Sequence, residues 1–219
     1  MAKENLAQFV IVDYGMGNLQ SVVNAFRFLG CPALISDRKE IIRCADAVIL
    51  PGVGAFGEAM NNLKKFDLIG ILNQKVLQQK IPFLGICLGM QLIAKDSEEH
   101  GLHQGLGWIN AHVKKIKVKQ GTRLPHIGWN NVTVHQPAPL FMDISRDFNF
   151  YFVRSYQLEC DPALVSATCD YDGRVTAAVQ KDNILATQFH PEKSQENGLR
   201  VLRGFINFVA QSKKELTHA

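Results

Sequence analysis

The stretch that most constrains the fold is residues 81–91, an apolar run that ends at a cysteine between two glycines. Residues 81–84 have the length and apolar content of a strand buried on both faces, and residues 88–95 continue at helical spacing. Cys87 therefore lies where a strand turns sharply into a helix. The small flanking residues permit the strained backbone that such a turn requires. We expect this strand to be central to the fold.

Cys87 occupies the position of the nucleophile in a Gly-x-Ser-x-Gly turn, with sulfur in place of oxygen. A helix that starts here brings a partial positive charge and free amide groups to the sulfur, which favours a reactive thiol and can stabilise an oxyanion. The alternative is a structural cysteine, since unpaired cysteines are among the most buried residues of proteins. The two glycines favour the nucleophile.

The second chemical segment is His190-Pro191-Glu192, which follows an apolar run over residues 183–189. Pro191 keeps the segment extended, and the two-residue period places His190 and Glu192 on one side. A histidine that takes the thiol proton needs a third group to fix its orientation, and Glu192 can supply it. The tripeptide alone would also suit a surface turn. Together with Cys87 it predicts a catalytic triad.

Strands and helices alternate through the first half of the chain, which is typical of an α/β fold with an open, mostly parallel, twisted sheet and flanking helices. The patterns predict a strand at 9–12, a helix at 19–29, a strand at 33–35, a short helix at 41–42, a strand at 47–50 and a helical region at 57–79. At 219 residues and 47% hydrophobic content, the chain suits one domain that spans residues 1–219.

The second half of the chain has the pattern of short strands separated by turns. These strands are expected near 109–118, 129–135, 149–159, 164–169, 175–180 and 183–189. Some of them should be antiparallel, so the fold prediction adds an antiparallel β portion in the C-terminal half. A last helix, with apolar residues on one stripe between Leu199 and Val209, is expected to cover the sheet.

A glycine-rich loop at residues 51–57 follows the third predicted strand. Its three glycines allow backbone amides to approach a ligand closely, and ligands of open α/β sheets bind beyond the carboxyl ends of the strands. We expect this loop to supply the second donor to an oxyanion, beside the amides that follow Cys87. A simple strand-to-helix turn would have the same composition.

Charge and cysteine content exclude several classes of function. A net charge of +4 does not predict nucleic-acid binding without a concentrated basic patch. The five cysteines form no Cys-x-x-Cys pair, so neither a disulfide framework nor a metal site is expected. Gly15-x-Gly17 lacks the third glycine of a dinucleotide loop, because Gln20 stands there, and no cofactor is predicted.

Membrane attachment and secretion are not expected either. No apolar run approaches the ~18 residues of a membrane span. The first five residues carry an acidic side chain and do not have the pattern of a secretory signal. A reducing cytoplasm, in which a reactive thiol survives, is the expected location.

The cysteine segment 85–91 and His190-Pro191-Glu192 resemble those of the triad glutamine amidotransferases. Within that family, the further segments 51–57, 124–130, 151–156 and 189–194 look like those of the glutaminase subunits of imidazole glycerol phosphate synthases. The resemblance runs from about Phe9 to Val209. It implies an enzyme that hydrolyses glutamine to glutamate and ammonia through a thioester intermediate.

The resemblance also implies catalytic roles. Cys87 would be the nucleophile, His190 the general base and later the acid, and Glu192 the residue that orients the imidazole. The amides of Val53 and Leu88, with Gly52, would surround the carbonyl group of glutamine.

The remaining substrate contacts are implied in the same way. Gln91 and Glu99 would hold the α-amino end of glutamine, Ser155 and Tyr156 its carboxylate end, with Gly52 beside the carbonyl. Charge supports Glu99, because an ammonium group needs an anion beside it. A solvated loop would also explain residues 97–99.

A partner is implied, because the chain has no second catalytic constellation in which ammonia could be used. By resemblance the partner is a (β/α)₈-barrel cyclase, which forms a heterodimer with this chain. It makes imidazole glycerol phosphate and an aminoimidazole carboxamide ribotide in histidine biosynthesis. The isolated chain is therefore expected to have low glutaminase activity and to be strongly activated by the partner with its ligand.

Four residues are candidates for the partner interface. Trp129 is a candidate anchor, although a core tryptophan would look the same in sequence. Asn18, Arg154 and Lys193 are further candidates. Arg154 stands where the family commonly has histidine, and an arginine there alters the groups that this position can meet.

Three other functions fit the same residues. A paralogous subunit of this fold could supply ammonia to another synthase, for example one that amidates a surface sugar. A stand-alone cysteine hydrolase, such as a γ-glutamyl peptidase, would act without a partner. A non-catalytic interaction subunit would keep the fold without the reaction.

Overall fold

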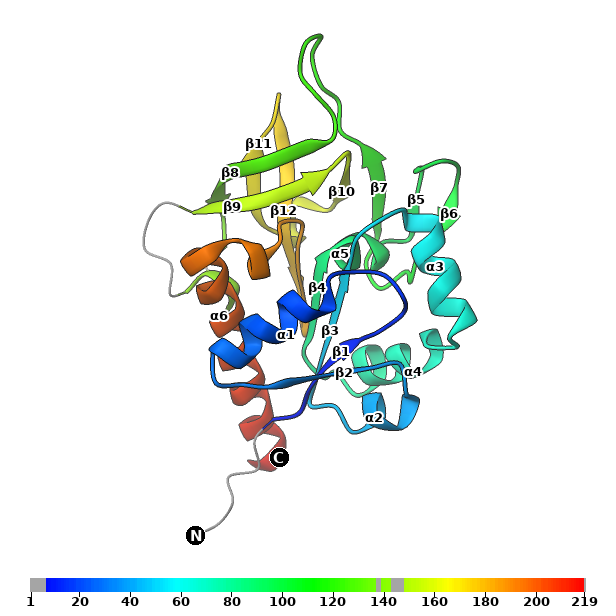
Figure 1. The fold of residues 1–219 in the computed structure, drawn as a ribbon, viewed down its shortest axis with the longest axis vertical. Coiled ribbons are helices and arrows are strands. Elements are labelled where there is room, and N and C mark those ends of the chain that lie inside the picture. The colour runs from blue at the N-terminus through cyan, green and yellow to red at the C-terminus, as the bar shows by residue number, and fades with distance from the viewer. Residues whose placement is uncertain (1–6, 137–138, 143–147, 219) are drawn as a thin grey trace.

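The computed structural model describes residues 7–136, 139–142 and 148–218. The first five residues, which were considered above as a possible secretory signal, lie outside the described residues. A nine-stranded sheet forms the centre of the described chain, with strand order β2-β1-β3-β4-β13-β12-β11-β8-β9 (Figure 1). Its strands are β1 (Phe9–Val12), β2 (Ala33–Ser36), β3 (Ala47–Gly52), β4 (Phe83–Cys87), β8 (His126–Val134), β9 (Asn149–Arg154), β11 (Val165–Asp170), β12 (Arg174–Lys181) and β13 (Ile184–Thr187). Neighbours from β2 to β13 are parallel and the remaining pairs are antiparallel, which confirms the predicted fold class.

A smaller four-stranded sheet lies beside the large one, with strand order β10-β7-β5-β6. It contains β5 (Asp96–Ser97), β6 (His103–Gln104), β7 (Ala111–Lys115) and β10 (Tyr156–Cys160). The single strand expected at 149–159 is thus two strands in two different sheets, and Ser155 alone connects them. This crossing is central to the site described below.

Helices cover both faces of the large sheet. One face carries α1 (Leu19–Phe28) and α6 (Gln195–His218), and the other carries α2 (Lys39–Arg43), α3 (Phe56–Lys65), α4 (Ile69–Asn73), the π-helix η1 (Gln74–Gln78) and α5 (Leu88–Leu92). The helical region expected at 57–79 is broken at Asp67, whose φ of 53° lies in the left-handed region. The sequence pattern is continuous there, so only the backbone conformation reveals the break.

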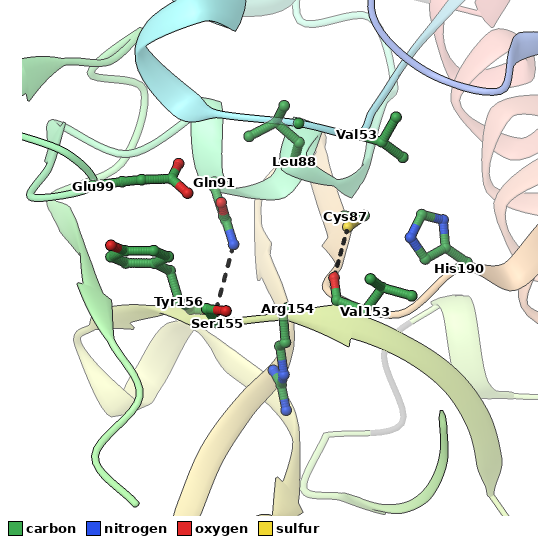
Figure 2. A pocket seen from close by; sticks show the side chains of 11 residues that line it. Val53, Cys87, Leu88, Gln91, Glu99, Val153, Arg154, Ser155, Tyr156 and His190 are labelled. Atoms are coloured by element: carbon green, nitrogen blue, oxygen red, sulfur yellow. Dashed lines mark hydrogen bonds between the residues drawn. The ribbon is translucent and has the colours of Figure 1, made fainter. Parts of the chain in front are cut away.

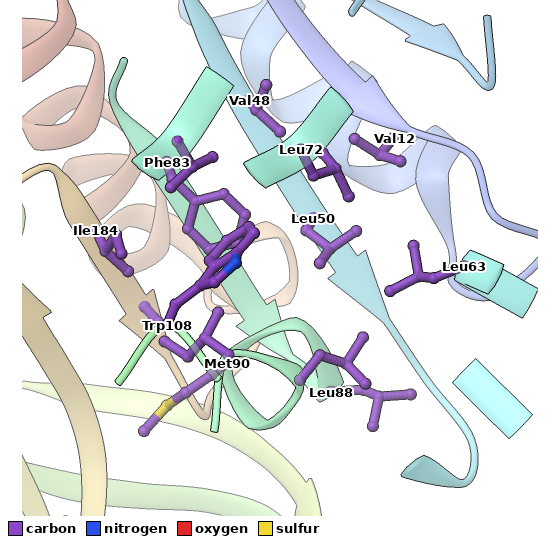
Figure 3. Close-up of a cluster of buried hydrophobic side chains, with 14 of the residues drawn as sticks. Val12, Val48, Leu50, Leu63, Leu72, Phe83, Leu88, Met90, Trp108 and Ile184 are labelled. Atoms are coloured by element: carbon purple, nitrogen blue, oxygen red, sulfur yellow. The ribbon is translucent and has the colours of Figure 1, made fainter. Parts of the chain in front are cut away.

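Two apolar clusters follow from the two-residue period of the strands. In β1, Val10 and Val12 belong to the cluster under α3 and α4, whereas Phe9 and Ile11 belong to the one under α1 and α6. Figure 3 shows the first cluster, in which the buried Trp108 packs edge-on against Phe83 with ring centroids 4.9 Å apart. The parallel strands are therefore apolar on both faces, as expected for a sheet covered by helices on both sides.

Candidate active site

A pocket of about 110 Å³ opens where β3, β4 and β13 end, at the carboxyl edge of the parallel strands (Figure 2). It is lined by Val53, Gly54, Cys87, Leu88, Gln91, Glu99, Val153, Arg154, Ser155, Tyr156 and His190. Cys87 and His190 lie at one end of the pocket, and Glu99 and Tyr156 lie at the other. Segments from five parts of the sequence therefore meet at this edge.

Cys87 is the last residue of β4, and α5 begins at the next residue, so the strand-to-helix turn predicted from the sequence is present. The backbone of Cys87 has φ 55° and ψ −107°, a conformation that a non-glycine residue rarely adopts. The neighbouring glycines make room for it. A methyl group at Gly89 would overlap the carbonyl oxygen of Leu50, and one at Gly85 would lie 2.8 Å from the carbonyl oxygen of Gly89.

The glycine beside the turn gives a first testable prediction. We expect Gly89→Ala to lower the free energy of unfolding by about 3 kcal/mol, because the added methyl group meets the backbone of β3 and neither strand nor helix can move freely. Gly70→Ala is the matched control, since nothing lies within 4 Å of the added methyl group and alanine favours the helix. Urea denaturation of both variants checks this, and equal stabilities would contradict it.

His190 follows β13 and is held from behind by a carboxylate. Its Nδ1 donates to Oε1 of Glu192 at 2.8 Å, and both side chains are only 3% exposed. Burial of the ring lowers its pKa, but the Cys87 sulfur and the Glu192 carboxylate outweigh this effect and raise the pKa of His190 to about 10. The folded chain therefore favours a protonated imidazole at this position.

Cys87 does not form a hydrogen bond with His190 in this conformation. Its thiol donates to the carbonyl oxygen of Val153 at 3.8 Å, and Nε2 of Gln188 donates to the sulfur at the same distance. Nε2 of His190 is buried and has no hydrogen-bond partner among the described residues. Figure 2 shows the imidazole next to the sulfur, so a small rotation of the thiol would bring the two groups together.

Four of the five residues predicted to hold glutamine line one pocket, and Gly52 does not; the four are Gln91, Glu99, Ser155 and Tyr156. The side-chain nitrogen of Gln91 donates to Oε1 of Gln188 at 3.0 Å and to the carbonyl oxygen of Tyr156 at 3.5 Å. Oε2 of Glu99 accepts from the backbone nitrogen of Phe56 at 2.7 Å, where α3 begins. Glu99 therefore provides a carboxylate at the pocket and also caps the helix that follows the 51–57 loop.

The loop after β3 lies across the pocket from residues 153–156 and approaches Cys87 from that side (Figure 2). Val53 and Gly54 line the pocket with Leu88, whereas Gly52 does not. Gly52 packs against Tyr14, whose hydroxyl donates to the carbonyl oxygen of Pro51 at 2.9 Å. Gly54, which the sequence did not single out, has a φ of 107° and so depends on being glycine.

Two polar residues of the site were missed by sequence reasoning. Gln188 is fully buried and contacts both Cys87 and Gln91, and its spacing of two residues from His190 was the available signal. Ser194 donates to the carbonyl oxygen of His190 at 2.6 Å and accepts from the backbone nitrogen of Tyr151 at 3.0 Å. This hydroxyl holds the histidine segment against β9, which only the tertiary structure reveals.

The four interface candidates do not all lie at the surface. Asn18 and Lys193 are exposed, and Trp129 is 46% exposed, so Trp129 is not a core residue. Arg154 is 4% exposed, and its side chain points away from the pocket into the sheet layer. The expectation that this arginine faces a partner is therefore corrected: it continues the buried face of β9, on which every second residue is buried.

A buried histidine beside Arg154 gives a second prediction. The ring of His126 stacks on Phe152 and Tyr171, with centroids 5.3 and 3.8 Å away. Burial, together with the charge of Arg154, lowers the pKa of His126 from 6.5 to about 4. The unfolded chain therefore binds this proton more tightly than the folded chain, and protonation of His126 favours unfolding. The contribution of neutral His126 to the free energy of unfolding is complete above pH 6.5 and is lost as the pH falls towards 4.

His126→Phe keeps the stacked ring and removes the titrating group. We expect the variant to lose about 2 kcal/mol less free energy of unfolding than the wild type between pH 6.5 and 4. Urea denaturation at several pH values measures this difference. Parallel pH profiles for the two proteins would contradict the assignment.

No group of three or more histidine, cysteine, aspartate or glutamate side chains in residues 7–136, 139–142 and 148–218 is arranged to hold a metal ion. None of the helices in these ranges combines the length and the apolar content that crossing a membrane requires.

Comparison with known proteins agrees on one family. The family model of glutamine amidotransferase class-I matches residues 10–208. A protein of Vibrio vulnificus named imidazole glycerol phosphate synthase subunit HisH 2 is 43% identical over 213 residues, which cover 97% of this chain and all of that protein. A protein of the same name from Methanococcus maripaludis is 46% identical over 197 residues, covering 90% of this chain and 97% of the relative.

Solved structures share the fold at lower identity. A crystal structure of a glutamine amidotransferase has a TM-score of 0.72 and 21% identity, and the match covers 92% of this chain and 98% of the other. The structure of PurLQS from Thermotoga maritima has a TM-score of 0.70 and 16% identity, covering 93% and 99% of the two chains. These two likenesses concern the fold.

Proposed function

The chain belongs to the class-I glutamine amidotransferase family, and on that premise we propose that it is the glutaminase subunit of an imidazole glycerol phosphate synthase. It hydrolyses glutamine to glutamate and ammonia and supplies the ammonia for histidine biosynthesis. Support comes from the relatives named imidazole glycerol phosphate synthase subunit HisH 2 and from the glutamine amidotransferase class-I family model. The observation that supports this most directly is the pocket shared by Cys87 and His190, with Glu192 bonded behind the imidazole.

The first half of the reaction forms a thioester. The Cys87 thiol passes its proton to His190, and the resulting thiolate attacks the carboxamide carbon of glutamine. The carbonyl oxygen becomes an oxyanion that accepts hydrogen bonds from the amides of Val53 and Leu88. The protonated His190 then gives its proton to the departing nitrogen, so the carbon–nitrogen bond breaks and ammonia leaves. The raised pKa of His190 suits this step, because the proton is present when the amine departs.

The second half uses water. His190, now neutral, takes a proton from a water molecule that attacks the thioester carbon. The carbon–sulfur bond breaks, glutamate leaves, and the Cys87 thiolate takes a proton back from His190, which restores the thiol and the neutral imidazole. Glu192 keeps the imidazole in one orientation throughout, since Nδ1 is committed to the carboxylate and Nε2 faces the sulfur.

The far end of the pocket binds the amino-acid part of glutamine. Glu99 offers a carboxylate to the α-ammonium group, and the side chain of Gln91 lies between Glu99 and the sulfur. Ser155 and Tyr156, at the crossing from β9 to β10, take the α-carboxylate. Gly52 does not line the pocket and packs against Tyr14 at the start of the oxyanion loop.

A cyclase partner receives the ammonia in this proposal. Asn18, Trp129 and Lys193 are exposed and form the expected interface with a (β/α)₈-barrel subunit, giving a heterodimer. Strand β8 links this surface to the site, because Trp129 pairs with Tyr151 and Ile127 pairs with Val153, whose carbonyl group holds the thiol.

Transfer of the amide nitrogen tests the proposed function. The chain, a barrel cyclase and the cyclase substrate are mixed with glutamine that carries nitrogen-15 in its amide group. We expect the label in imidazole glycerol phosphate, detected by mass spectrometry, and none when labelled glutamine is omitted. Release of glutamate without label in imidazole glycerol phosphate would overturn the histidine pathway and point to another ammonia acceptor.

A further inference from the structure

Arg154 occupies a position that the strand pattern assigns to the apolar core. Phe150, Phe152 and Arg154 are buried on one face of β9. Among the described residues, no carboxylate forms an ion pair with Arg154. Burial of a cation without a paired anion costs free energy, so an apolar residue would be at least as stable at this position. Stability alone does not explain the arginine.

The guanidinium group ties the end of β9 to the interior of the sheet. Nη1 donates to the carbonyl oxygen of Thr176 in β12 at 2.8 Å, and Nη2 donates to the sulfur of Cys169 in β11 at 2.7 Å. The group also lies 4.6 Å from the centre of the Phe152 ring, a cation–π contact. Because β9 is the edge strand and pairs only with β8, these bonds give its last residue a second attachment.

The backbone beside this attachment forms a wall of the pocket. The carbonyl group of Val153 holds the Cys87 thiol, and Ser155 and Tyr156 follow Arg154 directly. At this point the chain leaves the large sheet for the small one, so ladder bonds within β9 end at Arg154. Beyond it, Ser155 accepts a hydrogen bond from the backbone nitrogen of Ile116 at 2.9 Å and Tyr156 pairs with Lys115 in β7. The arginine therefore fixes the β9 side of this wall, and pairing with β7 fixes the other.

We propose that Arg154 is a positioning residue that holds the carboxylate-binding wall of the pocket, residues 153–156, at the correct distance from Cys87. This inference rests on the proposed function, in which Ser155 and Tyr156 take the α-carboxylate of glutamine. The cost of a buried cation is then explained by the reaction, since positioning errors of about 1 Å lower rates by roughly 10²-fold. The arginine acts through the backbone and does not contact the substrate.

The test compares two reagents that alkylate Cys87, both applied to the chain bound to a barrel cyclase with its ligand. One is 6-diazo-5-oxo-L-norleucine, a glutamine analogue with an α-carboxylate, and the other is iodoacetamide, which has none. We expect Arg154→Met to lower the labelling rate with the analogue by about tenfold or more, while the rate with iodoacetamide stays within about twofold of wild type. Mass spectrometry of the Cys87 peptide measures both rates. A general distortion of the site would slow both reagents together.

Three further variants and measurements sharpen the result. Arg154→Lys keeps one charged donor and is expected to fall between wild type and Arg154→Met in the ratio of the two rates. Arg174→Met changes an exposed arginine on β12, the strand that also contains Thr176, and should match wild type. The midpoint of urea unfolding of Arg154→Met is expected to equal or exceed that of wild type.

The outcomes separate this inference from the proposed function. Wild-type ratios in Arg154→Met, or equal slowing with both reagents, overturn the positioning role while leaving the glutaminase intact. If Arg154→Met does not fold, Arg154→Lys decides instead. A lower ratio of the rate with the glutamine analogue to the rate with iodoacetamide supports the positioning role, and an unchanged ratio overturns it. Failure of the wild type to react with the glutamine analogue, although iodoacetamide labels Cys87, overturns the proposed function and this inference with it.

Discussion

Replacing Cys87 by alanine is expected to lower kcat/KM for glutamine by at least about 10⁴-fold, measured as glutamate release in the presence of a barrel cyclase and its substrate. The sulfur forms the covalent intermediate in our mechanism, and no other described residue of the pocket is placed to replace it. Binding of glutamine should survive, because the groups that hold its amino-acid part are unchanged.

A matched variant controls for the loss of a thiol as such. Cys44 is an exposed cysteine in the described chain, away from the pocket, and Cys44→Ala should retain wild-type activity. A Cys87→Ala protein that still produces glutamate at a rate near that of wild type would contradict the assignment of the nucleophile.

Docking of the cyclase with its ligand is expected to raise kcat/KM for glutamine by at least about 100-fold over the isolated chain, which is about 2.7 kcal/mol of transition-state stabilisation. In the free chain the Cys87 thiol is bonded to the carbonyl group of Val153, and Nε2 of His190 has no partner among the described residues. The base is therefore not engaged. A partner seated on β8 would move Val153 through the strand pairing and release the thiol.

Steady-state kinetics with and without the cyclase measure this activation. Trp129→Ala should weaken it, because Trp129 is exposed and packs against Tyr151 with ring centroids 6.1 Å apart. Phe28→Ala is the control, since Phe28 is 76% exposed at the end of α1 and lies outside the proposed interface. Full activity of the lone chain would contradict the coupling.

Much of the fold could be predicted because the local signals agree with one another. The apolar runs at Phe9–Val12 and Ala47–Gly52 are strands, and the cysteine between Gly85 and Gly89 lies at the predicted turn. The break at Asp67 could not be predicted, because the apolar spacing continues across it and only the backbone conformation differs. The split of 149–159 into two sheets depends on pairing partners distant in sequence.

The residues of the candidate site could be predicted where they belong to short sequence motifs. Cys87, His190 and Glu192 carry such motifs, and the structure brings these residues together. Gln188 escaped notice because a buried glutamine in an apolar run has no motif of its own. Arg154 was a candidate for the partner interface, whereas the alternation along β9 buries it on the same face as Phe150 and Phe152.

The most direct measurement is to trap the intermediate. The chain and a barrel cyclase are mixed with isotopically labelled glutamine, the reaction is stopped with acid within the first turnover, and the peptides are analysed by mass spectrometry. We predict a γ-glutamyl group on the peptide that contains Cys87, and its absence in His190→Ala, in which the thiol is not activated. Glutamate formation at full rate with no adduct on Cys87 at any time point would contradict the account.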